Sequence, residues 1–237
     1  MKKTLLIIAL IFFGFQAKSQ VLLSLIFGDA LNSDGLEFGL QGGYNWSAMS
    51  GLESTKANAT FNLGFYFDIK LKDQLSLYTG VMVKQSVGAG ELTDTDIAFL
   101  GGTIFPEEGE YDQVSEFFYI PLLLKYKFRN NFFVELGPQI GYRRDAFVRF
   151  KSSSDNRKSE VKDFNDDLFN RFEVGAAGGI GYSFAKGPGI NITLSYYQGL
   201  TQAMKDFSGH RNNGTFLTVS VPIGAGKGKK SETTSDN

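Results

Sequence analysis

The sequence predicts an all-β protein, an eight-stranded antiparallel up-and-down transmembrane β-barrel. Three observations lead to this fold class. The N-terminus reads as an export signal, eight later segments alternate apolar and polar residues, and the connections between them alternate between short and long. Together they describe an exported chain that crosses a membrane with strands.

The N-terminal residues have the three parts of a secretory signal. Lys2 and Lys3 precede an apolar run, Leu5–Phe15, and the small residues Ala17 and Ser19 follow it. The run is too short to span a bilayer comfortably as a helix. We therefore expect a cleavable signal peptide over residues 1–20. Residues 21–35, which begin with the apolar stretch "VLLSLIF", are expected to form a short segment at the periplasmic interface.

Each predicted strand has an apolar face and a polar face. In "FFVELGPQIGY" the residues Phe132, Val134 and Leu136 share one face, and Glu135 and Gly137 share the other. Most of the segments have about the 9 to 11 residues that a tilted membrane strand needs. The eight are Leu36–Trp46, Phe61–Leu71, Leu75–Val83, Phe117–Phe128, Phe132–Tyr142, Phe172–Phe184, Ile190–Tyr196 and Leu217–Ile223.

The connections divide into two classes. The short ones are 72–74, 129–131 and 185–189, and the long ones are 47–59, 87–113, 144–170 and 200–214. Short turns at one end and long loops at the other are typical of an outer-membrane barrel, with the short turns in the periplasm. The barrel domain is thus expected over residues 36–223. The Gly/Lys/Ser-rich residues 224–237 are expected to be a disordered tail.

Two features favour lipid outside the barrel over a soluble, lipocalin-like barrel with an apolar interior. Aromatic residues lie at strand ends and aliphatic residues between them, as Phe132 and Tyr142 flank Val134 and Ile140. Such sorting by depth is typical of interfacial girdles. The polar face is rich in glycine, which makes room for larger side chains inside a narrow barrel. We expect localisation in the cell outer membrane.

The polar faces also carry charges of both signs in similar number. Buried charges require partners, so we expect a lumen plugged by salt bridges rather than an open pore. The predicted lumenal charges are Glu37, Asp68, Lys70, Lys84, Lys125, Lys127, Glu135, Arg143, Arg171 and Glu173.

Two prolines interrupt one predicted hairpin. With residues 129–131 as the turn, Pro121 lies opposite Gln139 and Pro138 lies opposite Leu122. Pro121 is expected to face the lumen and Pro138 the lipid. Only one of them removes a hydrogen bond from their shared seam, because successive N–H groups point to alternate neighbours. We expect a β-bulge or a lumenal side-chain donor to compensate.

Several of these segments resemble a known family. "FFYIPLLLKYKF" at Phe117–Phe128 and "FFVELGPQIGY" at Phe132–Tyr142 are similar to strands of the PorT-like outer-membrane β-barrel family of Bacteroidota. "LEFGLQGGYNWS" resembles its opening strand, and "VGAAGGIGYSF" resembles a later one. The resemblance implies an eight-stranded outer-membrane barrel, and its namesake is linked to type IX protein secretion. The tail after Ile223 departs from the aromatic C-terminus of many outer-membrane barrels.

The sequence offers little for catalysis. The single histidine, His210, lies near Ser208 and Asp206, but a short loop is a poor frame for a catalytic triad. Three acidic stretches, 93–96, 107–112 and 163–167, lack the spacing of a calcium loop, and we expect a hydrated surface there. "GAGKGKK" and "GAAGGIG" do not match nucleotide-binding motifs. No cysteine is present.

We therefore expect no catalytic, cofactor-binding or metal-binding residues. The net charge of -1 gives no case for nucleic-acid binding. The expected function is a non-enzymatic structural or partner subunit of a cell-envelope assembly. It would contact outer-membrane lipid, and other envelope proteins through its loops or barrel wall. A lipid-modifying barrel hydrolase and a soluble ligand-binding barrel are the alternatives.

Overall fold

A computed structural model describes residues 35–154, 157–185 and 189–223. The predicted signal peptide, nearly all of the interfacial segment and the C-terminal tail lie outside these ranges. Among the described residues, no helix is long and apolar enough to cross a bilayer. The elements are β1 (Leu36–Met49), β2 (Lys56–Lys72), β3 (Leu75–Gly90), α2 (Asp94–Phe99), β4 (Glu110–Lys127), β5 (Phe132–Ser154), β6 (Arg157–Phe164), the 3-10 turn η1 (Asp166–Leu168), β7 (Phe172–Ser183), β8 (Asn191–Gly199) and β9 (Asn212–Pro222).

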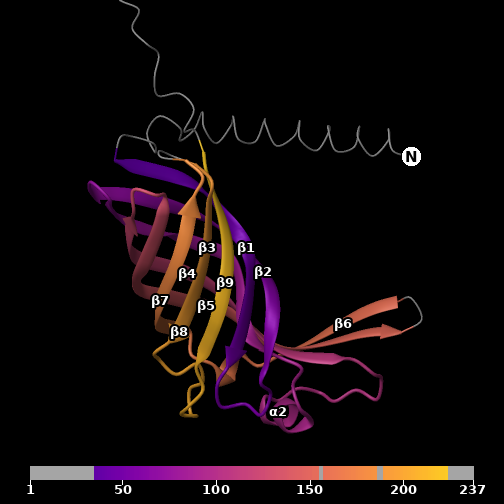
Figure 1. Ribbon diagram of the computed structural model, residues 1–237. Helices are drawn as coiled ribbons and strands as arrows, with labels where there is room; N and C mark the ends of the chain where they lie inside the picture. The colour runs from indigo at the N-terminus through magenta and orange to yellow at the C-terminus, as the bar shows by residue number, and fades with distance from the viewer. Residues whose placement is uncertain (1–34, 155–156, 186–188, 224–237) are drawn as a thin grey trace, which may run out of the picture.

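Eight of these strands close into an antiparallel ring, which confirms the predicted fold class. The order around the ring is β1–β2–β3–β4–β5–β7–β8–β9, and β9 pairs with β1 to close it (Figure 1). β6 lies outside the ring and pairs only with the far end of β5. Figure 1 shows this β5–β6 hairpin projecting sideways from the end of the barrel that carries α2.

The short turns are formed by residues that tolerate a left-handed backbone. Asp73 and Asn131 have positive φ angles of 38° and 69°, in the turns between β2 and β3 and between β4 and β5. Asn and Asp occupy this region more readily than other residues with a Cβ. The polar letters "RNN" thus close the β4–β5 hairpin in the predicted register, with Lys127 opposite Phe133 and Lys125 opposite Glu135.

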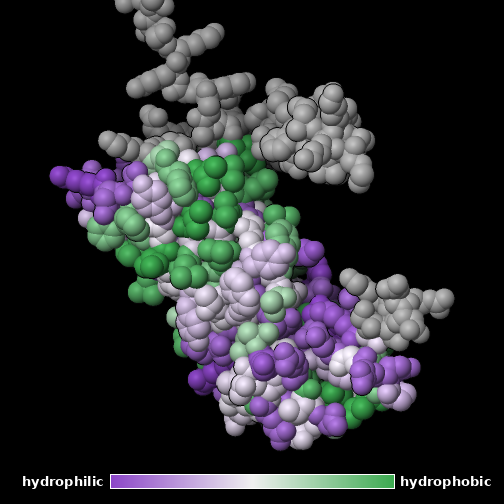
Figure 2. Space-filling model, turned by 45° about the vertical axis from the view of Figure 1, so that its right-hand side comes forward, coloured by the Kyte–Doolittle hydropathy of each residue, from purple (hydrophilic) through white to green (hydrophobic). Residues whose placement is uncertain are grey.

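The apolar faces of the strands point outward, as predicted. On β5 the residues Val134, Leu136 and Ile140 are all exposed, whereas Phe133 and Glu135 are buried. Figure 2 shows hydrophobic residues gathered around the upper part of the barrel and hydrophilic residues over the lower end. A soluble barrel would require the opposite arrangement. The outward face is suited to lipid.

Aromatic pairs mark both edges of this apolar band. Phe132 lies opposite Tyr182 and Tyr142 lies opposite Phe172 in the β5–β7 ladder, with ring centroids 5.1 and 5.4 Å apart. Phe132 and Tyr142 are ten residues apart, which is about 33 Å along the strand. A strand tilt of about 45° reduces this to roughly 24 Å, close to the apolar height of outer-membrane barrels.

Lumenal glycines make room for rings on neighbouring strands, as predicted. A Cβ on Gly39 would lie 2.5 Å from the ring of Tyr66, its direct partner on β2. A Cβ on Gly181 would lie 2.2 Å from the ring of Phe133, its partner on β5. Tyr66 and Phe133 are almost fully buried. The narrow interior therefore accommodates large side chains only where the facing residue has none.

The strands extend further from the membrane than the alternation predicted. β3 reaches Gly90 and β5 reaches Ser154, inside the expected loops 87–113 and 144–170. Beyond the girdle at Tyr142, neither face of a strand contacts lipid. Outward residues there no longer need to be apolar, so the two-residue pattern fades although the hydrogen-bonded ladder continues.

The prolines break two different seams, as predicted. Phe128 donates to the carbonyl of Phe132 on β5, and Lys127 donates to that of Gln74, just before β3. These two bonds fix the direction of the N–H groups along β4 as far as the register shift at Glu116/Phe117. Pro138 therefore removes a donor to Leu122 in the β4–β5 seam, and Pro121 removes one in the β3–β4 seam. Assigned pairing is missing at both places. Pro121 is buried and Pro138 is exposed.

The expected compensation in the shared seam is wrong. The β4–β5 register runs unchanged past both prolines and shifts only at Glu116/Phe117. No side-chain donor to the Leu122 carbonyl is present among the described residues. Instead this oxygen lies against Gly137, where a Cβ would be 2.2 Å away. A glycine beside the proline lets the two backbones approach closely.

Candidate functional site

Six of the ten predicted lumenal charges are held in polar contacts within the barrel or at its mouth. Lys125 is 4% exposed and forms an ion pair with Asp68 at 2.8 Å. Its ammonium also lies 4.2 Å from the ring centroid of Phe133, a cation–π distance. At the periplasmic end, Tyr66 donates a 2.7 Å hydrogen bond to Glu37. Lys127 donates to Ser183. Glu173 and Arg143 make the contacts described below.

Three predicted lumenal charges lie elsewhere. Lys70 and Arg171 are exposed at the strand ends. Lys84 is exposed because a register shift between Met82 and Gln85 inserts an extra residue into β3. Lys84 consequently pairs with the outward-facing Leu63. A one-residue shift moves a side chain to the opposite face of a sheet, and the alternation gave no sign of it.

Glu173 ties four strands together across the lumen. Its Oε1 accepts hydrogen bonds from the hydroxyls of Tyr119 on β4 and Tyr197 on β8, at 2.9 and 2.6 Å. Its Oε2 accepts one from the Asn212 amide on β9 at 2.5 Å. Glu173 itself lies on β7 and is 2% exposed. Three donors on one buried carboxylate make this a rigid cross-brace.

A cavity lies in the lumen beside this brace. It has a volume of about 50 Å³ and is lined by Glu135 and Gln139 of β5 and by Thr193 and Ser195 of β8, among others. The space exists because β7, which separates β5 from β8, has only glycine and alanine on the lumenal positions between Glu173 and Ser183. Those positions are Gly175, Ala177, Gly179 and Gly181.

A second hydrophobic core lies at the extracellular end, outside the membrane band. It contains ten buried residues from strand ends and from all four long connections. They are Met49, Ala89, Leu92, Ile97, Leu100, Ala146, Val148, Phe169, Ala203 and Met204. The long connections are therefore folded together into a cap with its own apolar interior. We call this set and its polar ties the extracellular cap.

Asp96 joins the first two connections of the cap. Its carboxylate accepts hydrogen bonds from the backbone N–H groups of Glu53 and Ser54, at 2.8 and 2.9 Å. It also forms a capping box with Thr93 at the start of α2. Asp96 is buried, so the expectation of a fully hydrated acidic surface over 93–96 is wrong. The spacing Thr93-x-x-Asp96 before an apolar run is a capping signal that could have revealed it.

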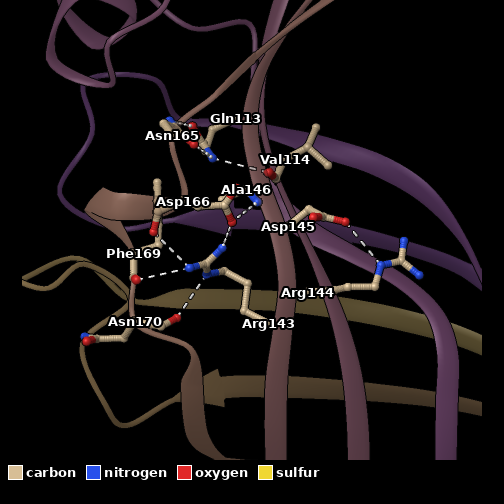
Figure 3. A network of polar contacts seen from close by, with 10 residues as sticks. All are labelled: Gln113, Val114, Arg143, Arg144, Asp145, Ala146, Asn165, Asp166, Phe169 and Asn170. Carbon is tan, nitrogen blue, oxygen red and sulfur yellow. Dashed lines mark hydrogen bonds and ion pairs between the residues drawn. The ribbon is translucent and has the colours of Figure 1, made fainter.

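Arg143 fastens the third connection (Figure 3). Its guanidinium forms an ion pair with Asp166 and donates to the backbone carbonyls of Phe169 and Asn170, at 3.2 and 3.1 Å. Asp166 also accepts from the Ala146 N–H at 3.0 Å. Arg143 is 3% exposed. This predicted lumenal charge therefore anchors the segment between β6 and β7 over the barrel mouth.

Two asparagines link the third connection to its neighbours. Asn165 exchanges side-chain hydrogen bonds with Gln113 of β4 (Figure 3). It also donates to the Leu100 carbonyl at 3.0 Å. Asn170 donates to the carbonyls of Gln202 and Met204, both at 3.0 Å. All four long connections are thus joined by hydrogen bonds that buried or half-buried side chains donate or accept.

Just outside the girdle at Tyr142, Arg144 forms an ion pair with Glu116 at the bulge between β4 and β5. The hydrogen bond that Arg144 donates to the Glu116 carboxylate raises the pKa of the Arg144 guanidinium above its usual value. The guanidinium therefore stays charged at any physiological pH.

The residues of the hydrolase alternative are not brought together. His210 is buried, and its ring stacks on Phe99 with centroids 5.5 Å apart. Neither ring nitrogen has a hydrogen-bond partner in the part of the chain that the structure describes. Ser208 and Asp206 are both exposed. A general base in a triad needs a nucleophile and an orienting group within hydrogen-bond reach.

The acidic stretches form no metal centre within residues 35–154, 157–185 and 189–223. No group of three or more His, Cys, Asp or Glu side chains could hold a metal ion there. Asp163 instead accepts from the Thr103 N–H at 2.7 Å. The "GAAGGIG" stretch lies in β7 with no helix after it, and "GAGKGKK" lies outside the described residues.

Comparisons with known proteins fit this architecture. The family described as "Outer membrane protein beta-barrel domain" matches residues 23–205, which include β1 to β8. The chain is similar to Ail, the attachment invasion locus protein of Yersinia pestis (13% identity, 79% of this chain and 98% of that chain, TM-score 0.39). It is also similar to Neisserial surface protein A (8%, 79% and 99%, TM-score 0.41) and to OprG from Pseudomonas aeruginosa (12%, 79% and 93%, TM-score 0.38). No curated protein matches the chain.

Proposed function

The chain belongs to the outer membrane protein β-barrel domain family and lies in the outer membrane, and on this premise we propose that it is a non-enzymatic partner subunit of a cell-envelope assembly. The barrel anchors the chain in lipid. The extracellular cap and the β5–β6 hairpin bind a protein partner. In this proposal the barrel is a rigid anchor, and the cap is a binding surface that is ordered before the partner arrives.

The observation that carries this proposal is the joining of the four long connections. Asp96, Asn165 and Asn170 each cross from one connection to another, and an apolar core lies among them. Ordering flexible loops costs conformational entropy when a partner binds. A cap that is already ordered avoids much of this cost, which favours a binding role for it.

The β5–β6 hairpin offers a partner an unpaired strand edge in addition to its side chains. β6 pairs with β5 on one side and with no other strand on its second side among the described residues. Its polar and charged residues include Lys162 and Glu160, which contact each other at 3.4 Å. An exposed strand edge is suited to pairing with an extended segment of a partner.

A passive lumen is part of the proposal. The Glu173 brace and the buried rings of Tyr66, Tyr119 and Tyr197 occupy the barrel interior. An eight-stranded barrel has room only for side chains or one small ligand. These observations favour a structural anchor over a wide pore. The separation of Ser208 and Asp206 from His210 favours a non-enzymatic role.

The finer placement rests on sequence. "IPLLLKY" at residues 120–126 and "GPQIGY" at residues 137–142 resemble PorT-like barrels of Bacteroidota, so we extend the proposal to that branch. This resemblance makes a secretion-related assembly the first partner class to examine.

Affinity purification of the tagged full-length protein in mild detergent tests the proposal. We expect a specific envelope protein to be recovered and to be lost when residues 151–160 are replaced by Asn-Gly. Phe150 and Val161 are direct partners, so a two-residue turn can join them. An unrelated outer-membrane barrel serves as the control bait. Recovery of the same proteins with that bait would contradict the proposal, and so would lipid hydrolysis that His210→Ala abolishes.

A further inference from the structure

The barrel interior contains more negative than positive side chains, because Lys70, Lys84 and Arg171 are exposed on the outside. Among the residues that the structure describes, four carboxylates point inward or lie at the periplasmic mouth, those of Glu37, Asp68, Glu135 and Glu173, and two ammonium groups do so, those of Lys125 and Lys127. Arg143 does not correct the imbalance, because it is paired with Asp166 in the cap. Buried ions require compensating charge.

Among the described residues, Glu135 is the inward carboxylate with no hydrogen-bond or ion-pair partner. It is 7% exposed. Its direct cross-strand neighbour is Lys125, but the Lys125 ammonium is engaged by Asp68 and by the Phe133 ring. No hydrogen bond or ion pair joins the Glu135 carboxylate to any other residue in the described ranges. By contrast, Glu173, which is also buried, accepts three hydrogen bonds.

Glu135 lines the lumenal cavity, together with neutral oxygen-bearing groups. Gln139 lies four residues along the same strand and so on the same face. Ser195 of β8 lies in register with Glu135 across Gly179 of β7, and Thr193 lies two residues from Ser195 on the same strand. Thr218 of β9 completes this polar side. Amide and hydroxyl oxygens beside one carboxylate are suited to a cation that prefers hard ligands.

We propose that this cavity binds a small monovalent cation, an alkali-metal or ammonium ion, with Glu135 as its counter-charge. The cavity volume of about 50 Å³ accommodates roughly three to five particles of this size at about 10–15 Å³ each. One ion with two or three waters fills it. A calcium ion takes six to eight oxygen ligands, often with several carboxylates, and only one carboxylate lines this cavity.

Crystals of the full-length barrel soaked in RbCl provide the direct test, because rubidium scatters anomalously. We expect an anomalous peak in the cavity within coordination distance of a Glu135 carboxylate oxygen. An ammonium arm follows, in which NH4Cl competes with RbCl and lowers the peak height. A cavity that contains water only, with no rubidium peak, would overturn the proposal.

A solution test uses thermal unfolding of the detergent-solubilised protein in KCl, RbCl or NH4Cl against N-methyl-D-glucamine chloride at equal ionic strength. We expect the small cations to raise the melting temperature of the natural protein. Glu135→Gln should weaken the apparent cation affinity at least tenfold. Ser195→Ala, which keeps the charge and removes one oxygen, should weaken it less. Glu160→Gln, on the exposed hairpin, is the matched control and should respond like the natural protein. Equal responses of Glu135→Gln and Glu160→Gln would refute the site.

Discussion

Tyr197 donates a 2.6 Å hydrogen bond to Glu173, whereas the adjacent Tyr196 points outward and its hydroxyl contacts Gln198 at 3.3 Å. Tyr197 is 1% exposed and Tyr196 is 49% exposed. These two neighbouring tyrosines thus lie on opposite faces of β8, Tyr197 in the lumenal brace and Tyr196 on the lipid face. This arrangement allows the contribution of the brace to be measured with a matched pair of substitutions.

Tyr197→Phe should destabilise the barrel by about 1.5–3 kcal/mol, because it removes one donor to a buried carboxylate and leaves the ring in place. Tyr196→Phe should change the free energy of unfolding by less than about 0.5 kcal/mol. Equilibrium denaturant unfolding in micelles, followed by fluorescence of Trp46, gives both values. Similar effects of the two substitutions would show that Glu173 is not a structural hub.

Gly175→Ala should also destabilise the barrel, by about 1–3 kcal/mol through overpacking. Its Cβ would lie 2.4 Å from the Tyr197 ring and 2.5 Å from the Gln198 carbonyl oxygen. Gly178→Ala on the same strand is the control, because its nearest contact is the flexible end of Leu136 at 3.1 Å. The same unfolding assay compares the two, and a larger loss for Gly178→Ala would contradict the packing argument.

Asp96→Ala should loosen the extracellular cap and leave the membrane band unchanged. The substitution removes the acceptor of the Glu53, Ser54 and Thr93 N–H groups. We expect amide hydrogen exchange at residues 53 and 54 to accelerate at least tenfold, equivalent to about 1.4 kcal/mol. Asp94→Ala changes an exposed carboxylate on the same helix. It should leave that exchange nearly unchanged; acceleration by both variants would indicate general fraying of α2.

Much of the membrane band could be predicted from sequence because every side chain that faces lipid must be apolar. That rule places Leu136 outside and Glu135 inside, and the turn at Asn131 then fixes the register of the β4–β5 hairpin. The pairing of particular charges could not be predicted in this way. A single bulge near Lys84 reverses its face, and the two-residue period contains no information about it.

The extracellular cap could not be predicted from alternation because it folds like a small soluble core. Its apolar residues, such as Ile97 and Met204, come from distant connections and follow no common period. The capping box at Thr93 and Asp96 was a local signal, but the partners Glu53 and Ser54 lie about forty residues away. Tertiary packing decides such contacts, and no spacing within one segment specifies them.

Pro138→Ala should strengthen the seam between β4 and β5. The substitution restores an N–H opposite the Leu122 carbonyl, which now lies against Gly137 without a backbone donor from Pro138. A new ladder hydrogen bond contributes about 0.5–1.5 kcal/mol. The greater freedom of the unfolded chain offsets part of this, about 0.4–1 kcal/mol. Global stability should therefore change little.

The local effect of this substitution is the decisive one. Hydrogen exchange of the Leu123 and Leu124 amides in micelles should slow several-fold in Pro138→Ala, because fluctuations that separate the strands must now break an additional bond. Pro222→Ala, at the end of β9, is the control, because it removes a proline without restoring a hydrogen-bond donor between β4 and β5. If Pro138→Ala leaves exchange in the hairpin unchanged, the hydrogen bond missing at Pro138 does not weaken the seam between β4 and β5. If exchange slows and recovery of the envelope partner also falls, the opening of this seam takes part in binding.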